Sequence, residues 1–134
     1  MAYDMYQERI LEHYRKPRNS GHLDHPDRQG KESNPLCGDQ IALELKLDPT
    51  HTIIEDVRFS GDGCAISVAS ASLLTQQIKG KPIAEVAKFS QKDLEKLVGV
   101  PLSPVRVKCA MTSFVALGQA LAEKPSQEAA TKSA

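Results

Sequence analysis

An alternating run near the middle of the chain constrains the fold more than any other feature. From Ile41 to Leu47 every second residue is a large apolar one, and Ala, Glu and Lys lie between them. Because successive side chains of a strand point to opposite faces, this run predicts a strand with one buried face. Residues 48–51 form a turn signal, and Ile53, Val57 and Phe59 predict a second strand that pairs back as a hairpin.

Helices are predicted on both sides of this hairpin. The first spans residues 5–15, where Asp4 and Gln7 resemble a capping box and Pro17 ends the helix. Residues 17–36 show no periodicity and are interpreted as an irregular loop. Small and apolar residues over 65–79 predict a buried helix that Gly80 ends. Shorter helices are expected at 83–89 and, capped by Ser90, at 91–98, and the last helix follows Pro104.

These elements predict one compact α+β domain, a small antiparallel sheet covered by helices on one face. A length of 134 residues suits a single core. The domain is expected to span residues 1–123, and the polar residues 124–134 to form a flexible C-terminal tail.

The charge balance excludes two classes of partner. The chain has 17 basic and 17 acidic residues, which offers no case for nucleic acid or an anionic membrane surface. No apolar run approaches the ~20 residues that cross a bilayer. The first residues also lack the basic and apolar regions of a signal peptide. We therefore expect a cytoplasmic protein.

Three cysteines, Cys37, Cys64 and Cys109, are the residues best suited to chemistry. In a reducing compartment an odd number of thiols does not suit a disulfide framework, which leaves inert residues, reactive thiols or metal ligands. Each cysteine is expected at a junction between elements, and helix N-termini and nearby cations favour the thiolate. Because a lone buried cysteine is more often inert, the pattern alone leaves a shared site and unrelated thiols about equally open.

Asp39, two residues after Cys37, is the natural fourth ligand of a shared site. No Cys-x-x-Cys pair is present, which argues against a zinc ribbon or a thioredoxin-like motif. A carboxylate is a poorer partner for a thiophilic metal than a fourth sulfur, so the site is expected to exchange ligands or cargo readily. The four histidines, at positions 13, 22, 25 and 51, are weaker candidates and are not assigned to the site.

Four segments of the chain form specific motifs: residues 11–19 (LEHYRKPRN), 34–39 (NPLCGD), 61–67 (GDGCAIS) and 106–110 (RVKCA). These motifs resemble those of the U-type iron–sulfur cluster assembly proteins, the family of IscU, SufU and the N-terminal domain of NifU. The resemblance runs from about residue 6 to 121. The resemblance implies a site at one end of the fold. There Cys37, Asp39, Cys64 and Cys109 would converge on zinc or a transient [2Fe–2S] cluster.

The resemblance also implies partners. A pyridoxal-phosphate cysteine desulfurase would supply sulfur as a persulfide, with Cys37 or Cys109 as the acceptor. Downstream apo iron–sulfur proteins or a carrier would receive the product. The expected oligomeric state is a monomer or a weak homo-oligomer.

Two functions fit this family, and a third needs no sulfur chemistry. The leading function is a scaffold, which is not an enzyme, that assembles and transfers a nascent cluster. The alternative is a zinc-dependent sulfurtransferase of the SufU type that relays persulfide without building a cluster. The third is a small zinc-stabilised domain.

The residues around the second and third cysteines point both ways within the family. Lys108 stands where IscU-type proteins carry a histidine, and residues 61–67 also resemble SufU. Yet the insertion that SufU-type chains usually carry between the second and third cysteines is missing. Residues 102–106 (LSPVR) only approximate the chaperone-binding motif Leu-Pro-Pro-Val-Lys of IscU.

Overall fold

The computed structural model describes residues 2–34, 38–99 and 101–122. In this part of the chain the strands are β1 (Arg28–Asn34), β2 (Asp39–Leu47) and β3 (Ile54–Asp62), which form one antiparallel sheet in the order β1-β2-β3. The helices are α1 (Ala2–Arg15), α2 (Ala65–Ile78), α3 (Ile83–Val86), α4 (Gln91–Val98) and α5 (Pro104–Ala122). The predicted tail, residues 124–134, lies outside the described residues.

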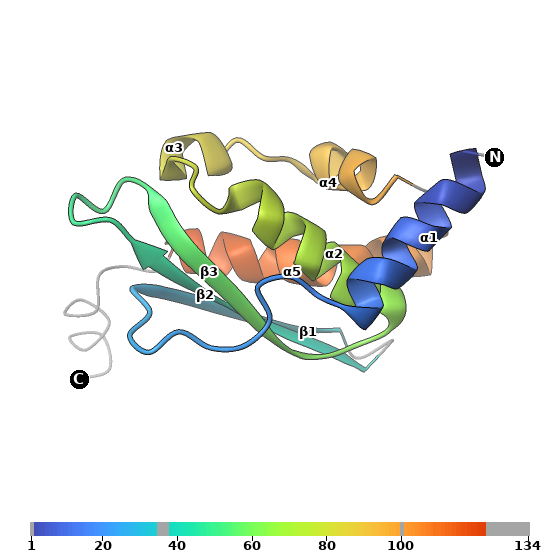
Figure 1. Cartoon of the computed structure of the whole chain (residues 1–134), viewed down its shortest axis with the longest axis horizontal. Helices are drawn as coiled ribbons and strands as arrows, with labels where there is room; N and C mark the ends of the chain where they lie inside the picture. Colours follow the sequence, from blue (N-terminus) through green and yellow to red (C-terminus); the bar gives the residue numbers. More distant parts are fainter. Residues whose placement is uncertain (1, 35–37, 100, 123–134) are drawn as a thin grey trace.

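The helices pack on one face of the sheet, as predicted. α5 lies along β1 and β2, α2 covers β3, and these two helices contact each other (Figure 1). α4 packs on both of them, and α1 packs against α2. Among the described residues, no helix combines the length and apolar character that a membrane span needs.

The predicted hairpin is confirmed, but the alternation of buried and exposed residues in β3 shifts by one position. The core-facing residues of β2 are buried at every second position from Asp39 to Leu47. In β3, however, Ile54 is fully buried, whereas Ile53 is exposed and lies before the strand. Lys46 pairs with Asp56 and Leu47 pairs with Ile54, so Glu55 has no partner in the register. This bulge shifts the alternation by one residue, so Ile54 and not Ile53 is in phase with the buried residues of the strand.

The strand β1 was missed, because residues 17–36 were interpreted as an irregular loop. Its sequence, RQGKESN, contains no large apolar residue, and its only fully buried position is Gly30. α5 approaches so closely there that a Cβ on Gly30 would lie 1.9 Å from the carbonyl oxygen of Ala116. A strand whose core position is occupied by helix backbone has no apolar pattern to detect.

α5 also contacts the open edge of the sheet at β1. The backbone N–H of Lys31 donates to the side chain of Gln119 at 3.1 Å. The guanidinium of Arg28 donates to the carbonyl of Leu121 at 3.0 Å, at the last turn of α5. These contacts cover part of the edge strand, and a covered edge is less open to pairing with another chain.

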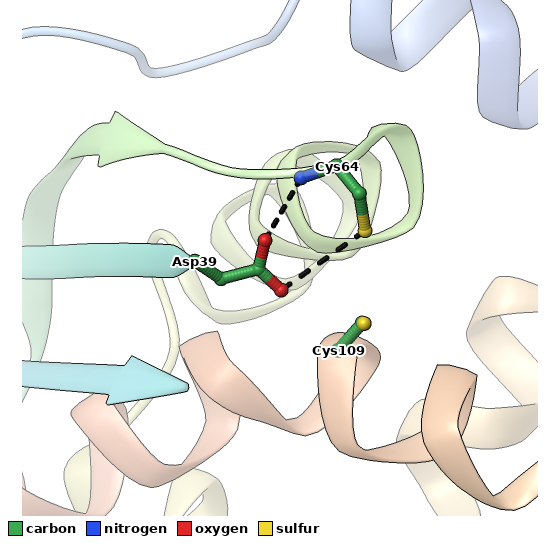
Figure 2. Close-up of side chains that lie close together, drawn as sticks. All are labelled: Asp39, Cys64 and Cys109. Atoms are coloured by element: carbon green, nitrogen blue, oxygen red, sulfur yellow. Dashed lines mark hydrogen bonds between the residues drawn. The ribbon is translucent and has the colours of Figure 1, made fainter. Parts of the chain in front are cut away.

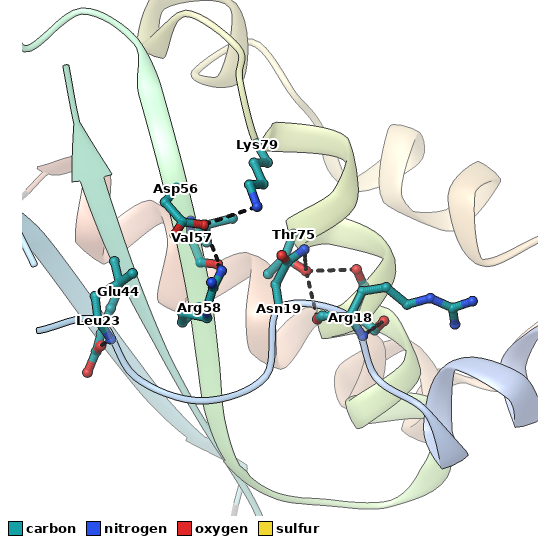
Figure 3. A network of polar contacts seen from close by, with 10 residues as sticks. Arg18, Asn19, Leu23, Glu44, Asp56, Val57, Arg58, Thr75 and Lys79 are labelled. Carbon is teal, nitrogen blue, oxygen red and sulfur yellow. Dashed lines mark hydrogen bonds and ion pairs between the residues drawn. The ribbon is translucent and has the colours of Figure 1, made fainter.

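The segment after α1 fastens that helix to the rest of the fold (Figure 3). Asn19, which adopts a positive φ of 62°, donates from its amide to Thr75 of α2 at 3.2 Å. Its carbonyl accepts from the backbone N–H of Phe59 in β3 at 2.8 Å. The backbone N–H of Arg18 donates to Ser72 of α2 at 2.8 Å. The LEHYRKPRN segment therefore holds α1, α2 and the edge of β3 together.

The predicted capping residues give the correct boundaries for α4 but not the correct start for α1. Ser90 and Asp93 form the predicted capping box, and Gly99 ends α4 in the left-handed conformation with a φ of 81°. α1 begins at Ala2, so the predicted start after Asp4 was wrong.

His13 provides a test of how α1 is held. It is buried, and its Nδ1 lies 2.7 Å from the hydroxyl of Ser72, which also accepts from Arg18. Burial, followed by the charge of Arg18, lowers the pKa of His13 below its ordinary value of 6.5. The unfolded chain therefore binds this proton more tightly. The contribution of His13 to stability is complete above pH 6.5 and is lost as the pH falls below it.

We expect His13→Gln to flatten the dependence of the free energy of unfolding on pH below about pH 6.5. Urea unfolding at pH 7.5 and at pH 5.5 measures the difference. His25→Gln is the control, because the side chain of His25 is exposed. The same loss of stability on acidification in His13→Gln and the unmodified protein would contradict the assignment.

Candidate metal site

Asp39 is the buried carboxylate around which the site is built. It is the first residue of β2 and shares the helix-facing side of the strand with Ile41 and Leu43. One carboxylate oxygen, Oδ1, accepts a hydrogen bond from the backbone N–H of Cys64 at 2.9 Å (Figure 2). The other, Oδ2, lies 4.0 Å from the Sγ atom of Cys64 and accepts a weak hydrogen bond from this thiol. The carboxylate is therefore oriented with Oδ2 toward the sulfur.

Cys64 is the N-cap residue of α2, as predicted. Its side chain makes no capping hydrogen bond and is partly exposed. The residue before it, Gly63, must remain small. A Cβ there would lie 2.8 Å from Asp39 Oδ1 and 2.9 Å from the hydroxyl oxygen of Ser67. The glycine thus allows the start of α2 to approach the carboxylate.

Cys109 approaches from α5. It lies in the second turn of that helix and is fully buried. Because α2 and α5 pack together, its sulfur lies near Cys64 and Asp39, as Figure 2 shows. The three ligand atoms, one carboxylate oxygen and two sulfurs, all lie within 4.8 Å of one another.

These dimensions suit a thiophilic metal. Ligand atoms of a tetrahedral zinc site lie at about 2.0–2.3 Å from the ion, and therefore about 3.3–3.8 Å from one another. The separation of up to 4.8 Å closes to that value with shifts of about an ångström, which side-chain rotations provide. Two sulfurs and one carboxylate match zinc or iron better than magnesium or calcium, which prefer oxygen ligands.

The remaining predicted residues fall into two groups. Cys37 lies outside the described residues. None of the histidines belongs to the group of possible ligands found in the described part of the chain. Arg106 and Lys108 are exposed on the first turns of α5, beside Cys109.

The sequence interpretation did not single out Ser67. It is fully buried in the first turn of α2, and its hydroxyl borders the same small space as Asp39. Its position three residues after Cys64, near that cysteine on the helix surface, was the signal available.

The fold and the thiol–carboxylate group together define a class, the small α+β proteins with a candidate metal site at one end of a helix-covered sheet. The NifU-like N-terminal domain model matches residues 5–131. The chain belongs to this family.

The comparisons identify relatives in both branches of the family. The zinc-dependent sulfurtransferase SufU of Bacillus subtilis is 39% identical over 137 residues, which cover 90% of this chain and 91% of that one. The iron–sulfur cluster assembly scaffold protein IscU of Aquifex aeolicus is 40% identical over 105 residues, 78% of this chain and 66% of that one. The crystal structure of FiSufU from Fervidobacterium islandicum AW-1 superposes with a TM-score of 0.74 at 27% identity. That match covers 90% of this chain and 99% of the other.

Proposed function

We propose that this protein assembles iron–sulfur clusters, taking sulfur from a cysteine desulfurase and holding the nascent [2Fe–2S] cluster on Cys37, Asp39, Cys64 and Cys109. The observation that carries the proposal is the convergence of Asp39, Cys64 and Cys109 from three separate elements within 4.8 Å. Filling a core does not require a buried carboxylate turned toward two sulfurs, and burying it has a cost that metal binding offsets.

Cys37 is included in this proposal because it is close to Asp39 along the chain. It is two residues from Asp39, and two residues of extended backbone span at most about 7 Å. A cysteine on so short a tether can supply the third thiolate. Gly38, with a φ of 71° and nothing within 4 Å of its missing Cβ, keeps this approach clear of side-chain bulk.

Transfer of sulfur from the desulfurase to this protein is a thiol–persulfide exchange. A thiolate of this protein attacks the outer sulfur of the desulfurase persulfide, a new S–S bond forms, and the desulfurase cysteine leaves as a thiolate. The transferred atom is sulfane sulfur, so its incorporation into a cluster as sulfide needs two electrons from an external reductant. Cys109 is fully buried and Cys64 is partly exposed. The burial of Cys109 favours another cysteine as first acceptor, and we assign Cys37.

The second candidate function is a zinc-dependent sulfurtransferase that relays persulfide without building a cluster. It is favoured by Lys108 before the last cysteine and by the 39% identity to a relative that bears this name. In this version zinc holds the thiolates until the desulfurase docks near Arg106 and Lys108. Persulfide on Cys109 rather than Cys37 after a single turnover would contradict it.

Anaerobic reconstitution with the desulfurase, cysteine, ferrous iron and a reductant tests both functions. Bound iron, acid-labile sulfide and zinc are quantified, and alanine production is followed in the same sample. A scaffold gains equal iron and sulfide, loses zinc, and passes the cluster to an apo-ferredoxin. A sulfurtransferase retains zinc, binds no cluster, and raises alanine production. If neither result is obtained, the domain is a zinc-stabilised fold without sulfur chemistry.

The cytoplasmic location of the protein stays a prediction.

Asp39→Ala should slow transfer of an assembled cluster to apo-ferredoxin by about tenfold, which corresponds to ~1.4 kcal/mol in the barrier. The carboxylate is the weakest ligand for iron in this set, so cluster release is expected to begin with its dissociation. Transfer is followed by the absorbance or circular dichroism of the acceptor. Asp62→Ala, at an exposed position of β3, is the control for charge. An unchanged rate of cluster transfer in Asp39→Ala would show that the carboxylate does not determine how readily the cluster is released.

A further inference from the structure

Three serine hydroxyls form an unexplained feature of the helix pair that carries the cysteines. Among the described residues, the buried side-chain oxygen or nitrogen atoms without a hydrogen-bond partner are the hydroxyls of Ser67, Ser70 and Ser113. Ser67 and Ser70 belong to α2, and Ser113 belongs to α5. A buried hydroxyl without a partner is costly, and such groups are rare in native proteins.

Ser67 differs from the other two because it lies beside the carboxylate. The position that a Cβ of Gly63 would occupy is 2.9 Å from the hydroxyl oxygen of Ser67 and 2.8 Å from Asp39 Oδ1. Since residue 63 has no side chain, nothing from that residue separates the hydroxyl from the carboxylate. Both oxygens border that one position, and rotation about the Cα–Cβ bond of Ser67 moves its hydroxyl relative to the carboxylate.

The two oxygens of Asp39 have different surroundings. Oδ1 accepts from the backbone N–H of Cys64 at 2.9 Å, whereas Oδ2 faces the thiol of the same residue at 4.0 Å. A metal held by the sulfurs is therefore reached by Oδ2. Oδ1 keeps capacity for a second donor, because a carboxylate oxygen accepts two hydrogen bonds. The hydroxyl of Ser67 and Oδ1 both border the position of the missing Cβ of Gly63.

We propose that Ser67 is a positioning residue of the metal site, whose hydroxyl donates to Asp39 Oδ1 while Oδ2 binds the metal. The inference rests on the proposed function, because it assumes that Asp39 is a ligand. A hydrogen bond to the outer oxygen of a ligating carboxylate fixes its orientation. In the metal-loaded protein, the hydroxyl that is unpartnered here gains a charged acceptor.

Binding of Co²⁺ and Zn²⁺ to Ser67→Ala tests this role, with Ser70→Ala and Ser113→Ala as matched controls. All three changes remove one buried, unpartnered hydroxyl from the same helix pair. Dissociation constants are measured by competition with a chelator, and the visible absorption of bound Co²⁺ reports the ligand geometry. Loss of an outer-shell partner weakens metal binding by about 10- to 100-fold. We expect this loss and an altered Co²⁺ spectrum in Ser67→Ala alone.

The metal-free protein and a double variant supply further readouts. Ser67→Ala removes an unsatisfied hydroxyl, so the metal-free variant should be as stable as the unmodified protein, or more so. In the Asp39→Ala background, Ser67→Ala should have no further effect on affinity, because its acceptor is gone.

The outcomes separate this inference from the proposed function. An unmodified protein that binds neither metal overturns both. Metal binding that is unchanged in Ser67→Ala, or weakened equally in all three serine variants, overturns the role of Ser67 alone. A loss that persists at full size without Asp39 also overturns it.

Discussion

Replacement of either Cys64 or Cys109 by alanine should weaken zinc binding by more than ~100-fold. Loss of an outer-shell partner alone costs up to about 100-fold, and loss of a direct thiolate ligand must cost more. Both sulfurs lie within 4.8 Å of each other and of the Asp39 carboxylate, so each is expected to bind the same ion. Competition with a chromophoric chelator at fixed pH gives the dissociation constants, since zinc binding displaces protons from thiols.

The control separates loss of a ligand from loss of nearby negative charge. Asp62→Asn removes a charge two residues before Cys64 at an exposed position, and it should leave zinc affinity within a few-fold of the original. Zinc bound at the original affinity by either cysteine variant would remove that residue from the site. A loss in the Asp62→Asn control as large as that in the cysteine variants would attribute the effect to charge.

Gly30→Ala should destabilise the fold by about 3 kcal/mol or more, the upper range for overpacking a core. The added Cβ would lie 1.9 Å from the carbonyl oxygen of Ala116 and 2.7 Å from the backbone nitrogen of Ala120. These are backbone atoms of α5, so no side-chain rotation relieves the overlap, and the helix must move away from β1. Urea unfolding measures the loss, and metal affinity should fall with it because α5 carries Cys109.

Gly118→Ala is the matched control within α5 itself. Nothing lies within 4 Å of the position of its missing Cβ. Alanine in a helix is more favourable than glycine by about 0.5–1 kcal/mol, so this variant should be slightly more stable than the unmodified protein. The two changes add the same methyl group, but their expected effects on the free energy of unfolding have opposite signs. A Gly30→Ala variant as stable as Gly118→Ala would refute the close approach of α5 to β1.

Periodicity along the chain predicted most of the elements, and the same periodicity also predicts the burial of Asp39. The alternation that begins at Ile41 extends back to Asp39, which is therefore buried on the core side of β2. A buried carboxylate in phase with core residues is a signal for a functional role. The register at Glu55 could not be predicted in this way, because a bulge depends on how β3 meets β2 across the sheet.

The sequence by itself determined the α+β class, the half-buried hairpin, the capped helix α4, and the placement of Cys64 and Cys109 at the starts of their helices. These follow from local rules, namely side-chain periodicity, capping and turn residues, which act over a few neighbouring positions. The resemblance to the family added the predicted ligand set.

Only the tertiary structure decided which distant residues meet. The strand β1 pairs with β2 beneath α5, which lies on Gly30. Asp39 meets Cys64 and Cys109 because β2, α2 and α5 pack together. The hydroxyl of Ser67 borders the carboxylate for the same reason. Such contacts join residues far apart in sequence, and they form only when the apolar faces of the sheet and the helices are buried against each other.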